Sequence, residues 1–424
     1  MKPRGLLRNG AVMGSGVLAS QAIGILSYPV LSRLFSPEDF GTFALFFFGM
    51  QVLGASLAGR YEQAIMLCRS QARARHTLQL AQATALAAAL ALVLLSGLFR
   101  HQLDAWSGAS LGAAWMAVPA AGFFVSVQTS LSFMAVRLGR FGAVSAARVV
   151  KPAAAFALQV ALAYALWGGT GALIAGETLG AALSILPVLR AGGKGPVLWR
   201  SARGRRYAGR LARFYASQPL WNLPHVFVNQ VSRWIMAALI TALYSAAEAG
   251  AYFMMFRVVM MPSTLVSGAL SQVFFRTAAE EQRQAGSFRG ALKATAAPLL
   301  GIGALTAAVL VLFGPDLFVL VLGPQWQPAG LMAAVFAPYI VLQMVLATVA
   351  PCYLLAGRQK AMLAVACGQT AVFLGGFLLG HWGGGSMFRA LGTSVWLSVP
   401  YMTAMLFWYW RLAASRNASQ KEAG

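Results

Sequence analysis

Two arginines stand inside long apolar stretches of the chain, where a charged side chain is costly. Arg233 lies near the middle of stretch 217–240, and Arg257 lies early in stretch 249–275. A charge at the centre of a bilayer costs about 2.5–3.5 kcal/mol on insertion scales, so such residues tend to face a cavity and to have a use. A guanidinium stays charged and binds phosphate oxygens in a bidentate manner. We therefore predict that both arginines hold an anionic diphosphate group; the alternative for Arg233 is pairing with Glu248 or snorkelling to the interface.

The stretch 217–240 also carries polar residues on one helix face. Three of them follow i, i+3, i+7 spacing: Asn222, His225 and Asn229. Pro219 and Pro224 should break or bend this helix near its start. A bent, polar helix that carries Arg233 is typical of a cavity wall, so both asparagines are predicted to bind substrate. The histidine titrates near neutrality when unperturbed, which makes it a candidate for ion coupling.

Two pairs of charged residues in the first half allow two interpretations each. Arg60 and Glu62 stand where stretch 41–59 ends, and their i, i+2 spacing would not let them face each other on a helix. They either gate an inner mouth, with Arg60 binding substrate and Glu62 coupling an ion, or they are plain interfacial charges. Arg148 and Lys151, at i and i+3, form a cationic patch on one helix face. That patch either attracts phosphate from the inner leaflet or anchors the chain.

Glu177 is the one carboxylate deep in an apolar stretch. Loss of water favours the protonated form of a carboxyl, which suits a proton carrier. The competing interpretation is a neutral, hydrogen-bonded core residue. Glu177 is therefore a second candidate for ion coupling beside His225.

The elements that position these residues follow from composition. Of 424 residues, 59% are hydrophobic and 10% are charged, whereas soluble domains carry roughly 25% charged residues. A membrane-spanning helix needs about 20 apolar residues, and the chain offers roughly twelve such stretches: 10–31, 41–59, 77–98, 112–136, 146–167, 169–189, 217–240, 249–275, 292–313, 329–353, 361–380 and 388–410. The net charge of +23 does not indicate nucleic-acid binding, because the basic residues lie in short runs between the apolar stretches.

Motifs for catalysis, cofactors and metals are missing from the sequence. There is no phosphate-binding loop of the G-x-x-x-x-G-K-[ST] type and no cluster of His, Cys and acidic residues with metal-ligand spacing. The acidic motifs and large outer loops usual in membrane glycosyltransferases are also missing. The sequence therefore predicts no metal site, no cofactor and no enzymatic activity.

Basic residues and an internal repeat predict the topology. Lys and Arg concentrate in alternate loops and above all in the segment 190–216, which places both termini on the cytoplasmic side. The motif of residues 34–41, LFSPEDFG, recurs as LYSAAEAG at 243–250 in the same orientation. We therefore predict an all-α integral membrane protein of about twelve spans, with an N-terminal six-helix lobe at 1–189, a basic cytoplasmic linker at 190–216, a C-terminal six-helix lobe at 217–411 and a cytoplasmic tail at 412–424.

The motif SRLFSPEDFG at 32–41, followed by Arg60-Tyr-Glu62, resembles the polysaccharide exporter, or O-antigen flippase, family. Segments at 217–250, 271–275 and 323–330 are similar to the C-terminal lobe of the same family. The resemblance implies two lobes around a central cationic cavity and an undecaprenyl-diphosphate-linked oligosaccharide that is moved from the cytoplasmic to the outer leaflet by alternating access. It also implies the bacterial inner membrane and a role in the synthesis of O-antigen, capsule or exopolysaccharide. The sugar cargo rests on the resemblance alone.

Several alternatives stay open at this point. A multidrug extruder of the same superfamily binds cations and would need acidic residues in its cleft, whereas the candidate cleft charges here are mostly positive. A peptidoglycan-precursor flippase carries two further helices, for which the chain has little room. The alternative that involves no transport is a membrane subunit of a polysaccharide assembly complex. The sequence leaves open whether the chain acts alone or with a polymerase and a chain-length regulator, and which ion drives transport.

Overall fold

The computed structural model describes residues 3–109, 111–165, 168–191, 202–356 and 359–414. Within these ranges it describes the backbone but not the side chains of 3–11, 202–206, 221, 225, 229, 261–262, 264–266, 269, 354 and 359–360. The described ranges are helical and contain no β-strand. The chain divides into two compact units, Met1–Phe253 (unit 1) and Met254–Gly424 (unit 2).

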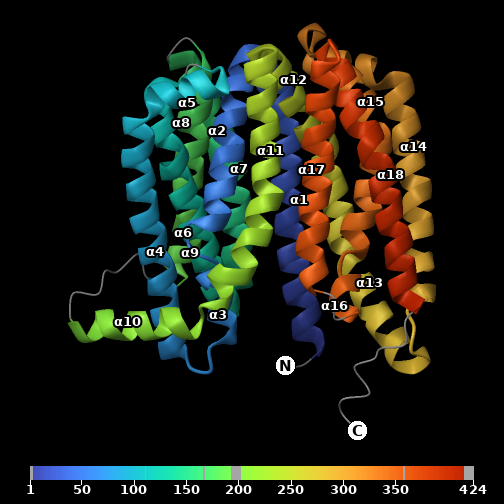
Figure 1. Ribbon diagram of the computed structural model, residues 1–424. Helices are drawn as coiled ribbons and strands as arrows, with labels where there is room; N and C mark the ends of the chain where they lie inside the picture. The colour runs from blue at the N-terminus through green and yellow to red at the C-terminus, as the bar shows by residue number, and fades with distance from the viewer. Residues whose placement is uncertain (1–2, 110, 166–167, 192–201, 357–358, 415–424) are drawn as a thin grey trace. The chain divides into compact units, whose positions relative to one another are not determined.

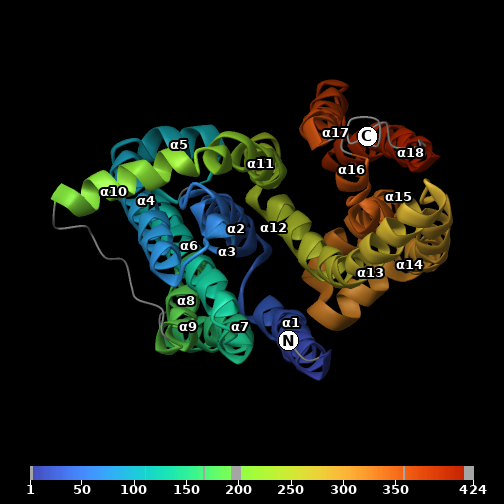
Figure 2. The same cartoon turned by 90° about the horizontal axis from the view of Figure 1, so that it is seen from below.

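Unit 1 is a bundle of long helices with short helices at its two ends (Figure 1). Its elements are α1 (Pro3–Leu34), α2 (Pro37–Ser56), α3 (Tyr61–Leu67), α4 (Gln71–Leu98), α5 (Arg100–Ser107), η1 (Gly112–Met116), α6 (Ala117–Arg137), α7 (Phe141–Ala165), α8 (Thr170–Leu183), α9 (Ile185–Arg190), α10 (Ala202–Phe214), η2 (Gln218–Asn222), α11 (Leu223–Leu243) and α12 (Ala246–Met255). Helix α2 packs between α6 and α11, and α7 packs between α1 and α8. Figure 2 shows this arrangement along the helix axes.

Unit 2 contains five long helical segments. Its elements are η3 (Phe256–Met260), α13 (Met261–Ala285), α14 (Arg289–Leu322), η4 (Pro324–Trp326), α15 (Gln327–Val349), α16 (Cys352–Leu355), α17 (Gln359–Trp382) and α18 (Met387–Ala414). Helix α15 is central, because it packs against α13, α14 and α18.

Eleven helices in the described part of the chain are long and apolar enough to cross a membrane. They match eleven of the twelve predicted stretches, with ends that differ by several residues. The twelfth, 249–275, corresponds to an unbroken helical run in which α12 passes through the π-helical turn η3 into α13. The prediction of an all-α integral membrane protein is therefore confirmed, and the chain is a multi-pass membrane protein. The division into six-helix lobes, linker and tail, and the cavity between the lobes, stay predictions.

The repeated motif builds the same local structure twice. Ser36 caps α2, because its hydroxyl accepts from the Asp39 N–H while the Asp39 carboxylate accepts from the Ser36 N–H. At the start of α12 the Ser245 hydroxyl accepts from the Glu248 N–H and donates to the Glu248 carboxylate. A Ser with an acid three residues later satisfies N–H groups that a helix start leaves unpaired. Both copies of the motif therefore start a helix in the same way.

The two copies also contact each other within unit 1. A Cβ added at Gly41 would collide with the backbone carbonyl of Ala246, and one at Gly250 would collide with that of Pro37. An offset of 209 residues maps Gly41 onto Gly250 and Pro37 onto Ala246, so the contacts are reciprocal. Glycine is needed at both positions because the helices approach backbone to backbone.

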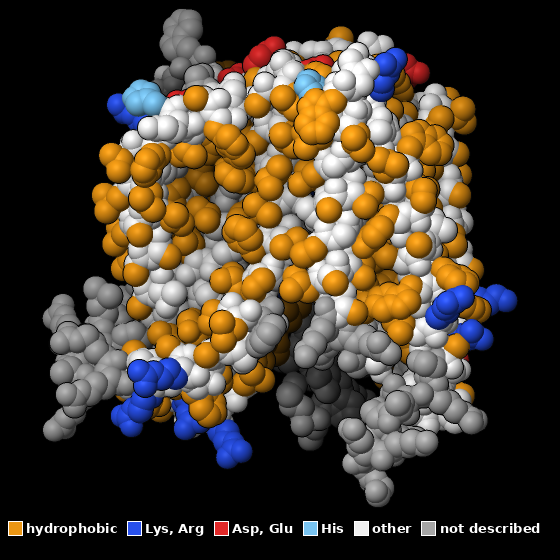
Figure 3. Space-filling model, viewed as in Figure 1, with side chains coloured by type: hydrophobic (Ala, Val, Ile, Leu, Met, Phe, Trp, Pro, Cys, Tyr) orange, Lys and Arg blue, Asp and Glu red, His pale blue; other side chains and the backbone are white. Residues whose placement is uncertain are grey.

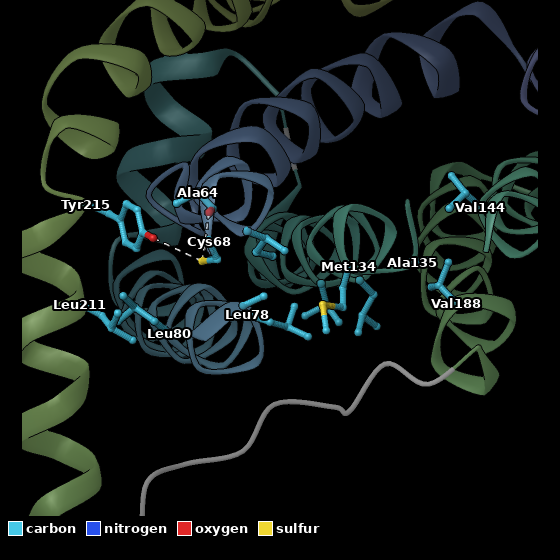
Figure 4. Close-up of a cluster of buried hydrophobic side chains, with 14 of the residues drawn as sticks. Ala64, Cys68, Leu78, Leu80, Met134, Ala135, Val144, Val188, Leu211 and Tyr215 are labelled. Carbon is cyan, nitrogen blue, oxygen red and sulfur yellow. Dashed lines mark hydrogen bonds between the residues drawn. The ribbon is translucent and has the colours of Figure 1, made fainter. Parts of the chain in front are cut away.

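The basic segment before α11 contains an amphipathic helix at one end of unit 1. Helix α10 runs across the direction of α4 (Figure 1). Its residue Leu211, and Tyr215 just after its end, belong to a buried cluster with residues of α3, α4 and α6. In this cluster the Cys68 thiol lies 3.3 Å from the Tyr215 hydroxyl (Figure 4). The backbone carbonyl of Cys68 accepts a hydrogen bond from the Arg137 guanidinium. Burial and the hydrogen bond with the Cys68 thiol raise the pKa of Tyr215 to about 12. The segment is therefore anchored to unit 1.

Candidate functional site

Helix α11 carries more of the candidate site residues than any other helix. It begins with an irregular turn at the position predicted from its prolines. Residues 218–222 form the π-helical turn η2, in which the N–H of Leu223 donates to the carbonyl of Gln218. Pro219 and Pro224 have no backbone N–H to donate, which disfavours a regular α-helix here. The Asn222 amide donates to the Gln218 side chain across 2.7 Å inside this turn. π-helical turns are frequent at functional sites.

Arg233 lies on α11, almost three turns beyond the π-helical turn. Its side chain is half-buried, and Nη1 donates to Gln230 Oε1 across 3.0 Å. Glu248, the predicted alternative partner, accepts from the hydroxyl of Ser245 at the start of α12. The guanidinium is thus held on a polar face of α11. The side chains of His225 and Asn229 lie outside the described part of the structure, which places only their backbone in α11.

Arg257 lies in unit 2, inside the π-helical turn η3 that joins α12 to α13. Its side chain is half-buried. A π-helical turn widens the helix by one residue and redirects the side chains on it. Both arginines of the predicted diphosphate site are therefore on helices with a π-helical turn, and their meeting in one cavity stays a prediction.

The structure corrects the prediction that Arg60 and Glu62 do not face each other. Arg60 Nη1 lies 3.2 Å from Glu62 Oε1. The i, i+2 argument assumed a helix, but Arg60 precedes α3 in the left-handed conformation, with φ of 61°. That conformation is uncommon for a residue other than glycine. It turns the Arg60 side chain toward the carboxylate.

Glu62 is buried, with 3% of its side chain exposed. Burial raises the pKa of its carboxyl, and a backbone hydrogen bond and Arg60 oppose this effect. Its Oε2 atom and the Nε atom of Arg60 are buried without a hydrogen-bond partner. A charged pair with unsatisfied atoms on a strained turn is unlike a plain interfacial charge, because such arrangements are costly and tend to occur at functional sites.

Glu177 also has a charged partner, which neither interpretation of the sequence included. Its Oε1 lies 3.2 Å from Lys151 Nζ, between α8 and α7. Helix α7 begins at Phe141, so Arg148 and Lys151 lie two to three turns inside it. Lys151 is half-buried and paired, whereas Arg148 is exposed. The expected cationic patch is therefore divided between an ion pair and an exposed charge.

Unit 1 also contains an apolar pocket of about 430 Å³ that sequence reasoning missed. It lies among α2, α4, α5, α6 and α11, and the α11 residues Phe227, Val231 and Trp234 line it. Their i, i+4, i+7 spacing is the signal that could have identified this second face of α11. The indole N–H of Trp234 is buried and has no hydrogen-bond partner. The pocket suits a hydrocarbon group and not a diphosphate.

Comparison with known families decides what kind of protein this is. A family model described as polysaccharide biosynthesis protein matches residues 30–330, well over half of the chain. This chain belongs to that family. The resemblance that the motif at 32–41 carries is thereby confirmed at the level of the family. No curated protein matches this polysaccharide biosynthesis family member in sequence.

Solved structures show the same fold at low sequence identity. The lipid II flippase MurJ, in an inward closed conformation, shares 12% identity over 94% of this chain and 87% of that chain, with a TM-score of 0.74. An inward-facing multidrug resistance MATE family transporter of the MOP superfamily shares 13% identity over 95% of each chain, with a TM-score of 0.62. A MOP superfamily transporter from Pyrococcus furiosus, described as having a binding pocket of reverse polarity, shares 14% identity over 97% and 96%, with a TM-score of 0.59. These neighbours are transporters and a flippase, not enzymes, and this family member has their fold.

Proposed function

We propose that this protein is a flippase that moves a polyprenyl-diphosphate-linked oligosaccharide from the cytoplasmic to the outer leaflet by alternating access. The observation that carries the proposal is the family match over residues 30–330, whose description is polysaccharide biosynthesis. The fold similarity to a lipid II flippase supports the movement of a lipid-linked saccharide across the bilayer. The undecaprenyl carrier and the inner membrane of a bacterium are parts of the same proposal.

The chemistry of the candidate site supports an anionic cargo. Arg233 stands on the candidate membrane span α11, and Arg257 stands in the turn η3 between α12 and α13. Guanidinium groups suit the bidentate binding of phosphate oxygens. The carboxylate of Glu177 is offset by Lys151, and that of Glu62 by Arg60. A cationic drug would need free carboxylates, whereas a diphosphate needs guanidinium groups. In this proposal Arg233, Arg257, Asn222 and Asn229 bind the diphosphate, and the apolar pocket on α11 receives part of the polyprenyl chain.

The orientation of the chain is part of the proposal. The segment 190–216 contains eight Lys and Arg residues and no Asp or Glu. Such segments remain on the cytoplasmic side of a membrane. Helix α10 then lies at the cytoplasmic interface, and both termini are cytoplasmic. A polymerase and a chain-length regulator are proposed partners that act on the cargo after it reaches the outer leaflet.

The experiment measures lipid-linked oligosaccharide, sorted by leaflet, in cells that lack the protein. The proposal expects glycolipid to build up in the cytoplasmic leaflet while surface polysaccharide disappears. Cells that make Arg233→Ala should resemble the deletion, and Arg233→Lys should restore part of the export as a point charge. Arg283→Ala, which removes an exposed arginine near the end of α13, is the matched control and should export normally.

The second candidate function is drug extrusion, which the fold similarity to a MATE family transporter favours. It predicts unchanged glycolipid and surface polysaccharide in the deletion strain, with increased sensitivity to cationic compounds. That result would overturn the flippase proposal. Uptake of fluorescent glycolipid by liposomes that contain only the purified protein separates a flippase from a non-transporting assembly subunit.

A further inference from the structure

An apolar groove of about 360 Å³ lies between α14 and α18 in unit 2. On α14 it is lined by Ala296, Ala297 and Leu300, and on α18 by Phe407 and Trp410. The two alanines leave room that a larger side chain would fill. Phe407 is 56% exposed and Leu300 is 36% exposed, so the groove opens at the surface of the unit. Both helices are candidate membrane spans, and such a surface faces lipid chains.

One end of this groove is strongly cationic. Lys293 is part of the lining, one turn before Ala297. Arg289 lies a further turn toward the start of α14, with its guanidinium 5.3 Å from the centre of the Trp410 ring. Arg411, at the end of α18, lies over the Phe407 ring at 4.7 Å. All three cations are exposed, and blue side chains gather at this end of α14 and α18 in Figure 3.

The carboxylate of Glu281 lies at the start of α14, the helix that carries Arg289 and Lys293. Glu281 accepts hydrogen bonds from the N–H groups of Gly290 and Ala291, at the start of α14. It therefore stabilises the helix start. The aromatic rings hold the two guanidinium groups beside the groove, because a cation is attracted to the face of an aromatic ring.

We propose that this groove binds an anionic phospholipid of the surrounding leaflet. One acyl chain lies along Ala297, Leu300 and Phe407, and the phosphate contacts Lys293, Arg289 and Arg411. Charge complementarity selects an anionic headgroup, since three cations lie at the end of the groove and none of them forms an ion pair with a carboxylate of the described residues. Trp410 lies at the level where the cations begin, and tryptophan is enriched at the boundary between hydrocarbon and water. Basic pockets between spanning helices are known to bind anionic headgroups.

This site is independent of the proposed transport function, because it lies on helices that carry none of the candidate cargo residues. Its occupant is a resident lipid that stabilises the contact between α14 and α18. Each cation close to an anionic lipid contributes about 1 kcal/mol, which corresponds to about a fivefold change in affinity.

The test uses the purified full-length protein with phosphatidylglycerol and phosphatidylcholine as probes, and it counts retained lipids by native mass spectrometry. We expect phosphatidylglycerol to be retained over phosphatidylcholine, and Lys293→Gln with Arg411→Gln to weaken retention by roughly 25-fold. Ala297→Phe should abolish retention although all cations remain, because it fills the groove. Arg276→Gln with Arg283→Gln removes the same charge from exposed positions of α13 and should have no effect.

Three outcomes would overturn the proposal. Equal retention of both lipids would show that charge does not select the occupant. An equal loss in the α13 control, or no loss in Ala297→Phe, would show that only diffuse surface charge attracts lipid. Displacement of phosphatidylglycerol by a polyprenyl diphosphate at equal concentration would assign the groove to the cargo. The first two outcomes leave the export proposal untouched, because the leaflet assay measures export separately.

Discussion

The ion pair between Lys151 and Glu177 allows a quantitative test of how α7 and α8 are held together. The two charged atoms lie 3.2 Å apart, and the side chains are 25% and 12% exposed. At this distance the attraction is about 5 kcal/mol for an effective dielectric constant of roughly 20, before the cost of removing both groups from water. Removal of one partner leaves the other charge in an apolar span. We therefore expect Glu177→Gln or Lys151→Met to cost about 3 kcal/mol.

The double variant should be about as stable as either single variant, and not twice as destabilised, because no unpaired charge remains. We expect a coupling free energy of about 2–3 kcal/mol between the two positions. The measurement is thermal unfolding of the purified protein in detergent. Unfolding is monitored as the fraction of protein that remains monodisperse after heating to each temperature. For a chain of 424 residues, each kcal/mol should lower the midpoint by about 1 °C.

Two results would refute this reasoning. If the single variants unfold at the wild-type temperature, the pair contributes nothing to stability. If the losses of the single variants add in the double variant, the two side chains do not interact in the membrane protein. Export in the double variant tests the coupling role of Glu177 separately. A stable, active double variant removes Glu177 as a candidate for ion coupling, and a stable variant without export shows that export needs Glu177, Lys151 or both.

Three further perturbations follow from the fold. Gly250→Ala should destabilise the protein by about 1–3 kcal/mol, because the added Cβ meets the Pro37 carbonyl. The control Gly142→Ala, with open space around the glycine, should not destabilise it. Equal midpoints of thermal unfolding for the two variants would contradict this prediction. Burial raises the pKa of Glu62 above 4.5, so its contribution to stability is complete below that pH and is lost as pH rises through the folded pKa. Glu62→Gln should reduce the fall of the unfolding midpoint with rising pH. If the midpoint of the variant falls as steeply as that of the wild type between pH 4 and pH 8, Glu62 is not the source of the fall. The pKa of Tyr215 is raised from 10.0 to about 12, so wild-type stability should fall between these pH values and Tyr215→Phe should lack that fall; the same fall in both proteins would assign it to other groups.

The membrane-spanning helices were predictable because hydropathy alone identifies a segment that lipid can solvate. Hydropathy does not identify where a helix begins. Helix α7 begins at Phe141, before the apolar stretch, and so carries Arg148 and Lys151 inside it. Hydropathy therefore did not show how far inside the helix these two cations lie.

The candidate site was predictable only where a pattern on one helix was sufficient. The polar face of α11 follows from residue spacing, and the irregular start follows from its prolines. The pair between Arg60 and Glu62 depends on a left-handed residue, and the pocket beside Trp234 depends on how five helices pack. Neither arises from the period of a single helix, because the local backbone at Arg60 decides the first and tertiary packing decides the second.

The reciprocal contact at Gly41 and Gly250 has a consequence for the ancestry of the chain. In a symmetric dimer, residue i of one subunit meets residue j of the other, and j meets i. Gly41 meets Ala246, and Gly250 meets the equivalent Pro37, so the contact has the form of a dimer axis within one polypeptide. If a half-length ancestor formed such a dimer, each substitution at this contact would have changed both symmetry-related copies of the contact. After fusion of two copies each substitution acts once, and the copies can differ, as Pro-Glu-Asp and Ala-Ala-Glu do, around glycines that the close approach of the backbones still requires.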